Sequence, residues 1–313
     1  MKVSIITPAY NCEDYIRASI DSILNQSYDD WELVIGDDGS TDATKKIIDS
    51  YTDNRIKRHH WSKNKGYLQM FNHLLSKASG DFMMSHDADD ISSSTRIEAQ
   101  LMVFQEFPSV GACGANVVFF GAHTEERLNN KNSSSGFVAK DYQNLPFAPA
   151  TIMYRREVYE AIGGFNPFFD RLSSMDQYWV YLIQEKFSIY YLDAPLYKAR
   201  MHATSNHRSV EMGNIKKLAS WDIYKMLRHQ RELTGTDSLE QNDIAAVEGF
   251  IKELGNNKRW LAEKYREYSA IRADVGDTRN AMLLGVRAVW EWPWRSINYR
   301  TLLYSIRKAM TSL

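Results

Sequence analysis

The sequence predicts an α/β fold in which a mostly parallel, Rossmann-like sheet is flanked by helices and followed by an all-helical C-terminal extension. Three observations support this prediction. Strand and helix patterns alternate over the first fifty residues, aspartate clusters follow two of the predicted strands, and long charged helices replace the alternation from about residue 210. Such alternation is typical of a parallel sheet with helices on both faces. We therefore expect a domain of residues 1–209 and a helical extension of residues 210–313.

The first elements follow from runs of β-branched residues and from apolar residues at helical spacing. Residues 3–7 form a β-branched strand that ends at Pro8, and residues 15–24 carry isoleucines and a leucine on one helical face. A second strand at 31–36 precedes a helix at 44–51. The same patterns predict strands at 55–61, 81–85, 110–120, 147–154 and 189–191, and helices at 67–78, 95–107, 158–162, 175–184, 214–233, 238–254 and 258–275.

Composition and charge exclude several classes of protein. Lys and Arg number 38 against 39 Asp and Glu, so no overall charge favours nucleic acid as a partner. Cys12 and Cys113 are the only cysteines, which excludes a disulfide framework and a cysteine zinc site and favours a reducing compartment. No apolar run reaches the length of a membrane span. We expect a cytoplasmic protein whose membrane association, if it has any, is peripheral at the inner face.

A cluster of three carboxylates follows the apolar strand 81–85. Asp87, Asp89 and Asp90 occupy three of four consecutive positions, where like charges repel one another. Mg²⁺ or Mn²⁺ would offset that repulsion, because these ions prefer oxygen ligands and need only one or two carboxylates when phosphate oxygens and water complete the shell. The alternative is an acidic turn that caps the following helix. The motif alone does not decide between the two.

A second acidic loop, residues 37–42, follows the strand 31–36. Taken alone it is a capped turn, because Gly39 supplies the turn and the Ser, Thr and Asp residues after it are common helix caps. In a parallel sheet, however, both acidic loops lie at the carboxyl edge, where α/β proteins bind ligands. The two loops together therefore predict a site for a metal-bound diphosphate.

These motifs resemble the family 2 inverting glycosyltransferases of GT-A fold. The resemblance covers about residues 1–205 and includes the order and spacing of the motifs. It implies transfer of a sugar from a nucleoside diphosphate to a hydroxyl of a glycan or glycolipid, in polysaccharide or glycolipid synthesis. The matching segments are Val3-Ser4-Ile5-Ile6-Thr7-Pro8-Ala9-Tyr10-Asn11, Asp37-Asp38-Gly39-Ser40-Thr41-Asp42, Asn64-Lys65-Gly66 and Asp87-Ala88-Asp89-Asp90.

The resemblance also implies roles for the residues at these positions. In that family the first loop and the loop 37–42 hold the nucleoside, and the DxDD loop holds the ribose and a divalent cation, here Mn²⁺ or Mg²⁺. Asp87 and Asp89 then form the DxD pair, and Asp89 or Asp90 contacts the cation. The implied nucleotide-binding residues are Pro8, Tyr10, Asp38, Asn64, Asp87 and Asp89.

Asp176 occupies the position of the general base in that family. The family usually has a Glu-Asp pair there, whereas this sequence reads Met175-Asp176 after a Gly163-Gly164-Phe165 segment that resembles the family's GGF. The alternative role for an aspartate at a helix start is an N-cap. As a base, Asp176 would accept the proton of the acceptor hydroxyl while the oxygen attacks the anomeric carbon opposite the diphosphate, which inverts the configuration.

Arg200 and His202 match a segment of the family that often reads Arg-x-His after the last strand. The resemblance implies contact with the diphosphate or a place in a lid over the donor, and it adds His202 to Asp89 and Asp90 as a metal ligand. A histidine here is otherwise a surface or hydrogen-bonded residue.

The last segment of the chain is rich in tryptophan and arginine. We interpret it as a helix packed on the domain or on a partner subunit of a homo-oligomer. The alternative is a peripheral membrane contact, because both residue types suit the lipid headgroup region. The residues concerned are Trp290, Trp292, Trp294, Arg287, Arg295, Arg300, Arg307 and Lys308, with Glu291 as the single acid.

Two other functions compete with the transferase. A nucleotidyltransferase of related fold would favour a glycine-rich basic loop near the start, and residues 7–15 contain neither Gly nor Lys. A catalytically silent nucleotide-binding module would explain Met175 in place of the usual Glu. For the transferase, family habit favours a UDP-sugar as donor, with GDP and dTDP open.

Overall fold

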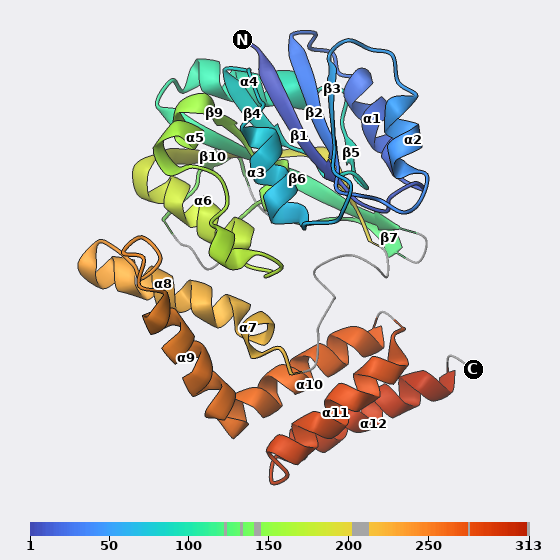
Figure 1. Cartoon of the computed structure of the whole chain (residues 1–313), viewed down its shortest axis with the longest axis vertical. Helices are drawn as coiled ribbons and strands as arrows, with labels where there is room; N and C mark the ends of the chain where they lie inside the picture. The colour runs from blue at the N-terminus through green and yellow to red at the C-terminus, as the bar shows by residue number, and fades with distance from the viewer. Residues whose placement is uncertain (122–123, 132–133, 141–144, 202–212, 275, 312–313) are drawn as a thin grey trace. The chain divides into compact units, whose positions relative to one another are not determined.

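The computed structural model describes the chain except residues 122–123, 132–133, 141–144, 202–212, 275 and 312–313 (Figure 1). The chain divides into an α/β unit, Met1–Arg171 with Met175–His202, and a helical unit, Leu172–Ser174 with Ala203–Leu313. The expected domain boundary at 209/210 lies outside the described residues. The predicted fold class, an α/β domain with a helical extension, is confirmed.

The described strands of the α/β unit form one sheet in the order β3-β2-β1-β4-β9-β6-β10-β5, with β7 beside β6 and β8 beside β10. β1, β2, β3 and β4 pair in parallel, and so do β6 and β10, whereas β9 runs antiparallel to both β4 and β6. The strands are β1 (Val3–Ala9), β2 (Trp31–Asp37), β3 (Ile56–His60), β4 (Phe82–Ser85), β5 (Ile91–Ser92), β6 (Val110–Gly121), β7 (Thr124–Leu128), β8 (Gly136–Phe137), β9 (Met153–Arg155) and β10 (Ser188–Arg200).

Helices cover both faces of this sheet. On one face, Ile16, Ile20 and Ile23 of α1 share a buried core with α4 and with alternate residues of β1 and β2. On the other face α3 lies so close to β2 that a Cβ at Gly36 would meet the Met70 sulfur at 2.3 Å. The helices of this unit are α1 (Ile16–Leu24), α2 (Thr44–Asp49), α3 (Tyr67–Leu75), α4 (Arg96–Glu106), α5 (Arg156–Ile162) and α6 (Met175–Lys186).

Two strand predictions were wrong in extent, one too long and one too short. The predicted strand 147–154 is reduced to β9, because Pro149 opens a 3₁₀ turn, η1 (Pro149–Thr151). The predicted strand 189–191 is the start of the much longer β10, which continues past Pro195 with a shift in its pairing to β6 at that residue. A proline is tolerated in a strand at such an irregularity.

A buried carboxylate joins the strands that begin the sheet. Glu32 of β2 is 4% exposed and accepts hydrogen bonds from Lys2 Nζ at 2.8 Å, Ser4 Oγ at 2.6 Å and the Ser79 N–H at 2.6 Å. Burial alone would raise the pKa of Glu32, but these hydrogen bonds outweigh it and lower the pKa to about 2. The residue therefore stays ionised and connects β1, β2 and the turn before β4.

The helical unit packs its last three helices closely. Leu261 and Tyr265 of α10 and Leu284 and Ala288 of α11 belong to one buried cluster. The buried Ser269 hydroxyl of α10 donates to a main-chain carbonyl of α11 at 2.8 Å. The helices are α7 (Ile215–Leu218), α8 (Ser220–Thr234), α9 (Ile244–Asn256), α10 (Lys258–Asp274), α11 (Thr278–Glu291) and α12 (Ser296–Thr311). Within the described residues, no helix combines the length and apolar character needed to cross a membrane.

Candidate active site

Three loops lie at one edge of the sheet because they follow adjacent parallel strands. β1 pairs with β2 on one side and with β4 on the other. The Asp38 N–H at the end of β2 donates to the Ala9 carbonyl at the end of β1 at 2.8 Å, and the His86 N–H after β4 donates to the Ile6 carbonyl at 3.1 Å. The two aspartate-bearing loops therefore flank the loop that follows β1.

Hydrogen bonds fasten the loop after β1 to the loop after β2. Asn11 has a φ of 47°, a conformation that asparagine tolerates better than most residues. Its N–H donates to Ser40 Oγ at 2.9 Å, and its Oδ1 accepts from the Thr41 N–H at 2.8 Å. The Glu13 N–H donates to Asp42 Oδ2 at 3.1 Å. The two loops thus form one fixed rim.

Asp38 connects this rim to the Asn64-Lys65-Gly66 segment. Its buried carboxylate accepts from the Lys65 N–H and the Gly66 N–H, both at 2.8 Å. Gly39 makes the close approach possible, since its φ is +71° and a Cβ there would lie 2.6 Å from the Lys63 carbonyl carbon. Asp38 therefore positions the loop before α3, and any contact with a nucleotide must use its remaining lone pairs.

The other residues expected near the nucleoside differ in accessibility. Pro8 is buried within β1, where it pairs in register with Gly36. Tyr10 is 46% exposed, and Asn64 is exposed as well. Tyr10 and Asn64 are therefore accessible to a ligand at this edge, whereas Pro8 shapes the floor of the rim.

A buried, neutral histidine, His86, directly precedes the acidic loop of residues 87–90. His86 Nε2 lies 2.9 Å from Ser19 Oγ, and its Nδ1 lies 3.2 Å from Ser92 Oγ. Burial and the nearby Arg96 guanidinium lower the pKa of His86 to about 3. The imidazole is therefore uncharged over the ordinary pH range, and its two hydroxyl partners fix the end of β4.

Tyr67, the first residue of α3, lies among the carboxylates of the site. Its hydroxyl donates to Asp87 Oδ1 at 3.0 Å, and the Asp87 N–H in turn donates to the Tyr197 hydroxyl at 3.0 Å. Burial, followed by the negative charges of Asp87, Asp176 and Asp89, raises the pKa of Tyr67 well above its ordinary value. The Tyr67 hydroxyl therefore bonds to Asp87 and lies within electrostatic reach of Asp89 and Asp176, three of the carboxylates that the sequence selects.

Asp90 and Arg200 hold the acidic loop in place. Asp90 is buried, and its carboxylate accepts from the Arg200 N–H at 2.7 Å and from the Tyr197 hydroxyl. Burial, with the neighbouring carboxylates, raises the pKa of Asp90 well above its ordinary value. The Arg200 Nε donates to the Asp89 carbonyl at 2.9 Å, and its guanidinium lies over the Phe120 ring at 4.4 Å. Both residues therefore support Asp89.

Cys12 lies between the two acidic loops. Its thiol is buried, and its N–H donates to Thr44 Oγ1 at 2.8 Å. Burial raises the pKa of Cys12 to about 12, and the negative charges of Asp89 and Asp42 add to the effect. One carboxylate from each acidic loop therefore lies within electrostatic reach of the same sulfur.

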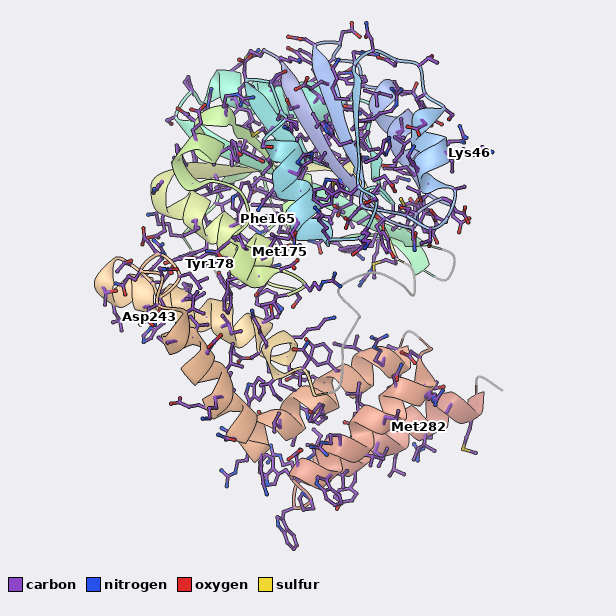
Figure 2. The ribbon with its side chains drawn as sticks, in the orientation of Figure 1. Lys46, Phe165, Met175, Tyr178, Asp243 and Met282 are labelled. Carbon is purple, nitrogen blue, oxygen red and sulfur yellow. The ribbon has the colours of Figure 1, made fainter. Side chains whose placement is uncertain are left out.

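Asp176 lies in the first turn of α6, which opens at Met175, labelled in Figure 2. Its half-buried carboxylate accepts from the N–H of the next residue, Gln177, at 2.9 Å. The Gly-Gly-Phe segment before it is fastened to α3, because Asn72 Nδ2 donates to the Phe165 carbonyl at 2.7 Å and Asn72 Oδ1 accepts from the Phe165 N–H at 2.8 Å.

The carboxylates fit an open metal site. Among the described residues, no three His, Cys, Asp or Glu side chains converge as a protein-only metal cage. Mg²⁺ and Mn²⁺ do not require one, because one or two carboxylates suffice when substrate phosphates and water supply the other ligands. Asp87 and Asp89, both half-buried, have the oxygen ligands that such a site needs. His202, expected as a metal ligand together with Asp89 and Asp90, lies outside the described residues.

Sequence reasoning missed three residues of the site. Tyr67 and Tyr197 bond to the acidic loop from 20 and 110 residues away in the chain. Asp170 accepts from Gln69 Nε2 at 3.3 Å, while its buried Oδ1 has no hydrogen-bond partner among the described residues. Lone tyrosines and a lone aspartate carry no recognisable motif. Only the fold brings the two tyrosines to Asp87, and it brings Asp170 to the Asn64-Lys65-Gly66 segment, where a Cβ at Gly66 would lie 3.1 Å from its Oδ1.

Comparison with known sequences identifies relatives of one kind. Residues 4–163 match the family described as glycosyl transferase family 2. The chain is 34% identical over 206 residues to the putative glycosyltransferase EpsE of Bacillus subtilis, an alignment that covers 64% of this chain and 73% of that protein. It is 36% identical over 137 residues to the UDP-Glc:alpha-D-GlcNAc-diphosphoundecaprenol beta-1,3-glucosyltransferase WfgD of Escherichia coli, covering 44% of this chain and 51% of WfgD.

Solved structures show the same fold. S. aureus TarS 1-349 in complex with UDP-GlcNAc has a TM-score of 0.62 at 20% identity, covering 98% of this chain and 92% of that one. The mannosyltransferase PcManGT from Pyrobaculum calidifontis, in complex with GDP-Man and Mn²⁺, has a TM-score of 0.54 at 19% identity, covering 99% of this chain and 86% of that one. At these identities the similarity concerns the fold alone.

Proposed function

The chain belongs to glycosyl transferase family 2 and has a GT-A type fold, and on that premise we propose that it is a metal-dependent, inverting transferase that uses a nucleoside-diphosphate sugar. The observation behind the proposal is that the Tyr67 hydroxyl donates to Asp87 and lies within electrostatic reach of Asp89 and Asp176. Three carboxylates on two separate elements provide for both tasks of such an enzyme, diphosphate binding through a cation and proton removal from the acceptor.

Asp176 is the proposed general base. Its carboxylate accepts the proton of the acceptor hydroxyl as that oxygen bonds to the anomeric carbon and the bond to the diphosphate oxygen breaks on the opposite face. The configuration at that carbon is inverted, and no covalent sugar intermediate is needed. The place of Asp176 in the first turn of α6, close enough to affect Tyr67 electrostatically, supports this role.

Asp89 is the proposed metal ligand, with Asp90 and His202 as the further ligands expected from the family resemblance. When bound, Mn²⁺ or Mg²⁺ would neutralise part of the charge that develops on the leaving diphosphate. The protein's own contribution is to hold the loop, since Arg200 bonds to the Asp89 carbonyl and Asp90 bonds to the Arg200 N–H.

UDP is the proposed nucleotide. The relative WfgD and the structural neighbour TarS are named with UDP-Glc and UDP-GlcNAc, whereas PcManGT is named with GDP-Man. WfgD is also named for a diphosphoundecaprenol-linked acceptor, which supports a growing glycan or glycolipid as the acceptor class here. Tyr10 and Asn64, exposed at the rim, together with Pro8 and Asp38, are the proposed contacts to the nucleoside.

A donor screen tests the proposal. Purified protein with Mn²⁺ or Mg²⁺ and a panel of nucleotide sugars should release the nucleoside diphosphate, slowly by hydrolysis when no acceptor is present. Pyrophosphate release from a sugar phosphate and a nucleoside triphosphate would instead identify a nucleotidyltransferase. Metal-dependent UDP binding without turnover of any donor would identify a silent module.

The variant Asp176→Asn tests the base. Transfer should fall by about 10²–10⁴-fold, the usual contribution of a general base, while UDP affinity stays within about twofold because the base does not hold the nucleotide. Glu157→Gln is a matched control, because Glu157 is likewise an acidic residue in the first turn of a helix of the α/β unit. It should transfer like wild type. Retained transfer by Asp176→Asn would refute its role.

A further inference from the structure

The last helix of the chain has an apolar stripe on its solvent-facing side. Tyr299, Leu303, Ile306 and Met310 of α12 are 44%, 54%, 36% and 72% exposed. Their spacing places them on one face of the helix. On the opposite face Ser305 is buried, and its hydroxyl lies 3.0 Å from Ser269 Oγ of α10. Since that contact fixes which side of α12 packs inward, the apolar stripe faces outward.

The preceding helix and the turn after it continue the exposed apolar surface. Leu283, Val286 and Trp290 of α11 are 44%, 54% and 75% exposed and recur at helical spacing. Trp294, in the turn between α11 and α12, is 91% exposed. Figure 2 shows the side chains that project from α11 and α12, with Met282 labelled on α11. Tryptophans with such exposure do not contribute to the core of the helical unit.

Positive charge accompanies these apolar residues. Residues 278–313 contain six Lys and Arg and one acid, Glu291, whereas the whole chain has a net charge of −1. Glu291 is itself paired with Arg287 at 2.8 Å. Arg300 and Arg307, both exposed, each follow directly after a residue of the α12 stripe. The C-terminal hairpin is therefore both apolar and strongly basic on the outside.

We propose that the α11–α12 hairpin lies on a membrane surface that contains anionic phospholipids. Exposed tryptophans and an apolar stripe enter the headgroup and upper acyl region, while neighbouring arginines bind lipid phosphates. The hairpin rests on the membrane and does not span it, which agrees with the absence of a spanning helix among the described residues. A second copy of this chain is disfavoured as the occupant, because it would bring the same surplus of positive charge to the contact.

Vesicle binding by the full chain tests this proposal. Wild type should sediment with vesicles of phosphatidylglycerol and phosphatidylcholine and bind pure phosphatidylcholine vesicles far less. The double variant Trp290→Ala/Trp294→Ala should lower the partition coefficient about tenfold or more, because it removes most of the exposed aromatic area. Arg300→Gln/Arg307→Gln should lower it roughly fivefold for each charge removed, on anionic vesicles only.

Controls separate binding from misfolding. Trp221→Ala removes a tryptophan of α8 that is 40% exposed and should leave the partition coefficient unchanged. All variants should melt within a few degrees of wild type, since the altered side chains are exposed. Three results would overturn the proposal: no vesicle binding by wild type, equal binding to neutral and anionic vesicles, or a dimer in sedimentation equilibrium that the double tryptophan variant abolishes. Vesicle binding does not depend on the identity of the sugar donor or on Asp176 as the general base.

Discussion

Tyr67, at the start of α3, bonds to Asp87 and lies within electrostatic reach of Asp176, the proposed base. Burial and the negative charges of Asp87, Asp176 and Asp89 raise the pKa of Tyr67, so its hydroxyl remains a donor at neutral pH. It shares a hydrogen bond with Asp87 and so restrains one oxygen of the DxD pair. We therefore expect Tyr67 to act as a positioning residue through Asp87.

Tyr67→Phe tests this role. We expect the affinity for UDP in the presence of Mn²⁺ to fall about tenfold, since a hydrogen bond to a charged group contributes about 1.5 kcal/mol. Titration calorimetry measures the change. Tyr190→Phe serves as control, because Tyr190 is also half-buried but, within the described residues, does not bond to the acidic loop. Its ring stacks on Phe107, with 5.0 Å between the ring centroids. Unchanged affinity in Tyr67→Phe would assign the hydroxyl no part in binding.

Asp89 and Asp90 are neighbours with different expected phenotypes. Asp89→Ala should abolish the metal-dependent part of UDP binding and leave stability nearly intact, because its side chain is half-buried. Asp90→Ala should cost about 2–3 kcal/mol of unfolding free energy, because it removes the acceptor of the Arg200 N–H within a buried site. Denaturant titration and calorimetry with and without EDTA separate the two. Equal loss of stability in both variants would contradict this division.

The sequence identifies the carboxylates of the site but not the tyrosines around them. Asp38, Asp87, Asp89 and Asp176 each belong to a motif that follows a strand or opens a helix, where local patterns are informative. Tyr197 is one aromatic residue within a strand, and nothing in its neighbours indicates that its hydroxyl reaches Asp87. Contacts of this kind depend on tertiary packing, which short patterns do not encode.

At the scale of elements, Asp38 connects the end of β2 to the loop before α3. In Asp38→Asn one of the two acceptors becomes an amide donor, so the Lys65 N–H or the Gly66 N–H loses its partner. We expect a loss of about 2 kcal/mol in unfolding free energy, together with weaker UDP binding because the rim is no longer fixed. Urea denaturation measures the first effect. Asp14→Asn, at an exposed position, should change stability by less than about 0.5 kcal/mol.

Glu32 makes the start of the sheet sensitive to acid. Its pKa is about 2 in the folded protein against an ordinary value of 4.5. A depressed folded-state pKa contributes stability that is complete above about pH 4.5 and is lost as the pH falls toward 2. The unfolding free energy of wild type should therefore exceed that of Glu32→Gln by about 3 kcal/mol at pH 7. This difference in unfolding free energy should narrow below pH 4.5. A gap that stays constant from pH 7 to pH 3 would contradict this linkage.

Elements with strong periodicity agree closely with the sequence prediction, and elements shaped by tertiary contacts do not. The strand 31–36 and the helix 175–184 correspond to β2 and α6 within one or two residues at each end. β9 is shorter than predicted because Pro149 opens a 3₁₀ turn, and β10 is longer because it continues past Pro195 with a shift in its pairing to β6. Nothing in the sequence of β9 itself indicates that this strand pairs antiparallel with both β4 and β6.

For the whole molecule, the fold class and the family are confirmed, and both follow from the order of the motifs along the chain. Parallel pairing of β2, β1 and β4 explains why loops fifty residues apart lie at one edge. The extension from residue 210 could be predicted as helical from amphipathic spacing. The sequence could not predict which faces of these helices are buried, because their burial depends on contacts among α10, α11 and α12.

A crystal structure with UDP and Mn²⁺, including an anomalous difference map, would show where the cation and the nucleotide bind. We predict a manganese peak about 2.1–2.3 Å from a carboxylate oxygen of Asp89, the diphosphate beside it, and the uridine between Tyr10 and the loop that Asp38 holds. A nucleotide bound elsewhere, or a manganese peak away from the acidic loop, would contradict the account.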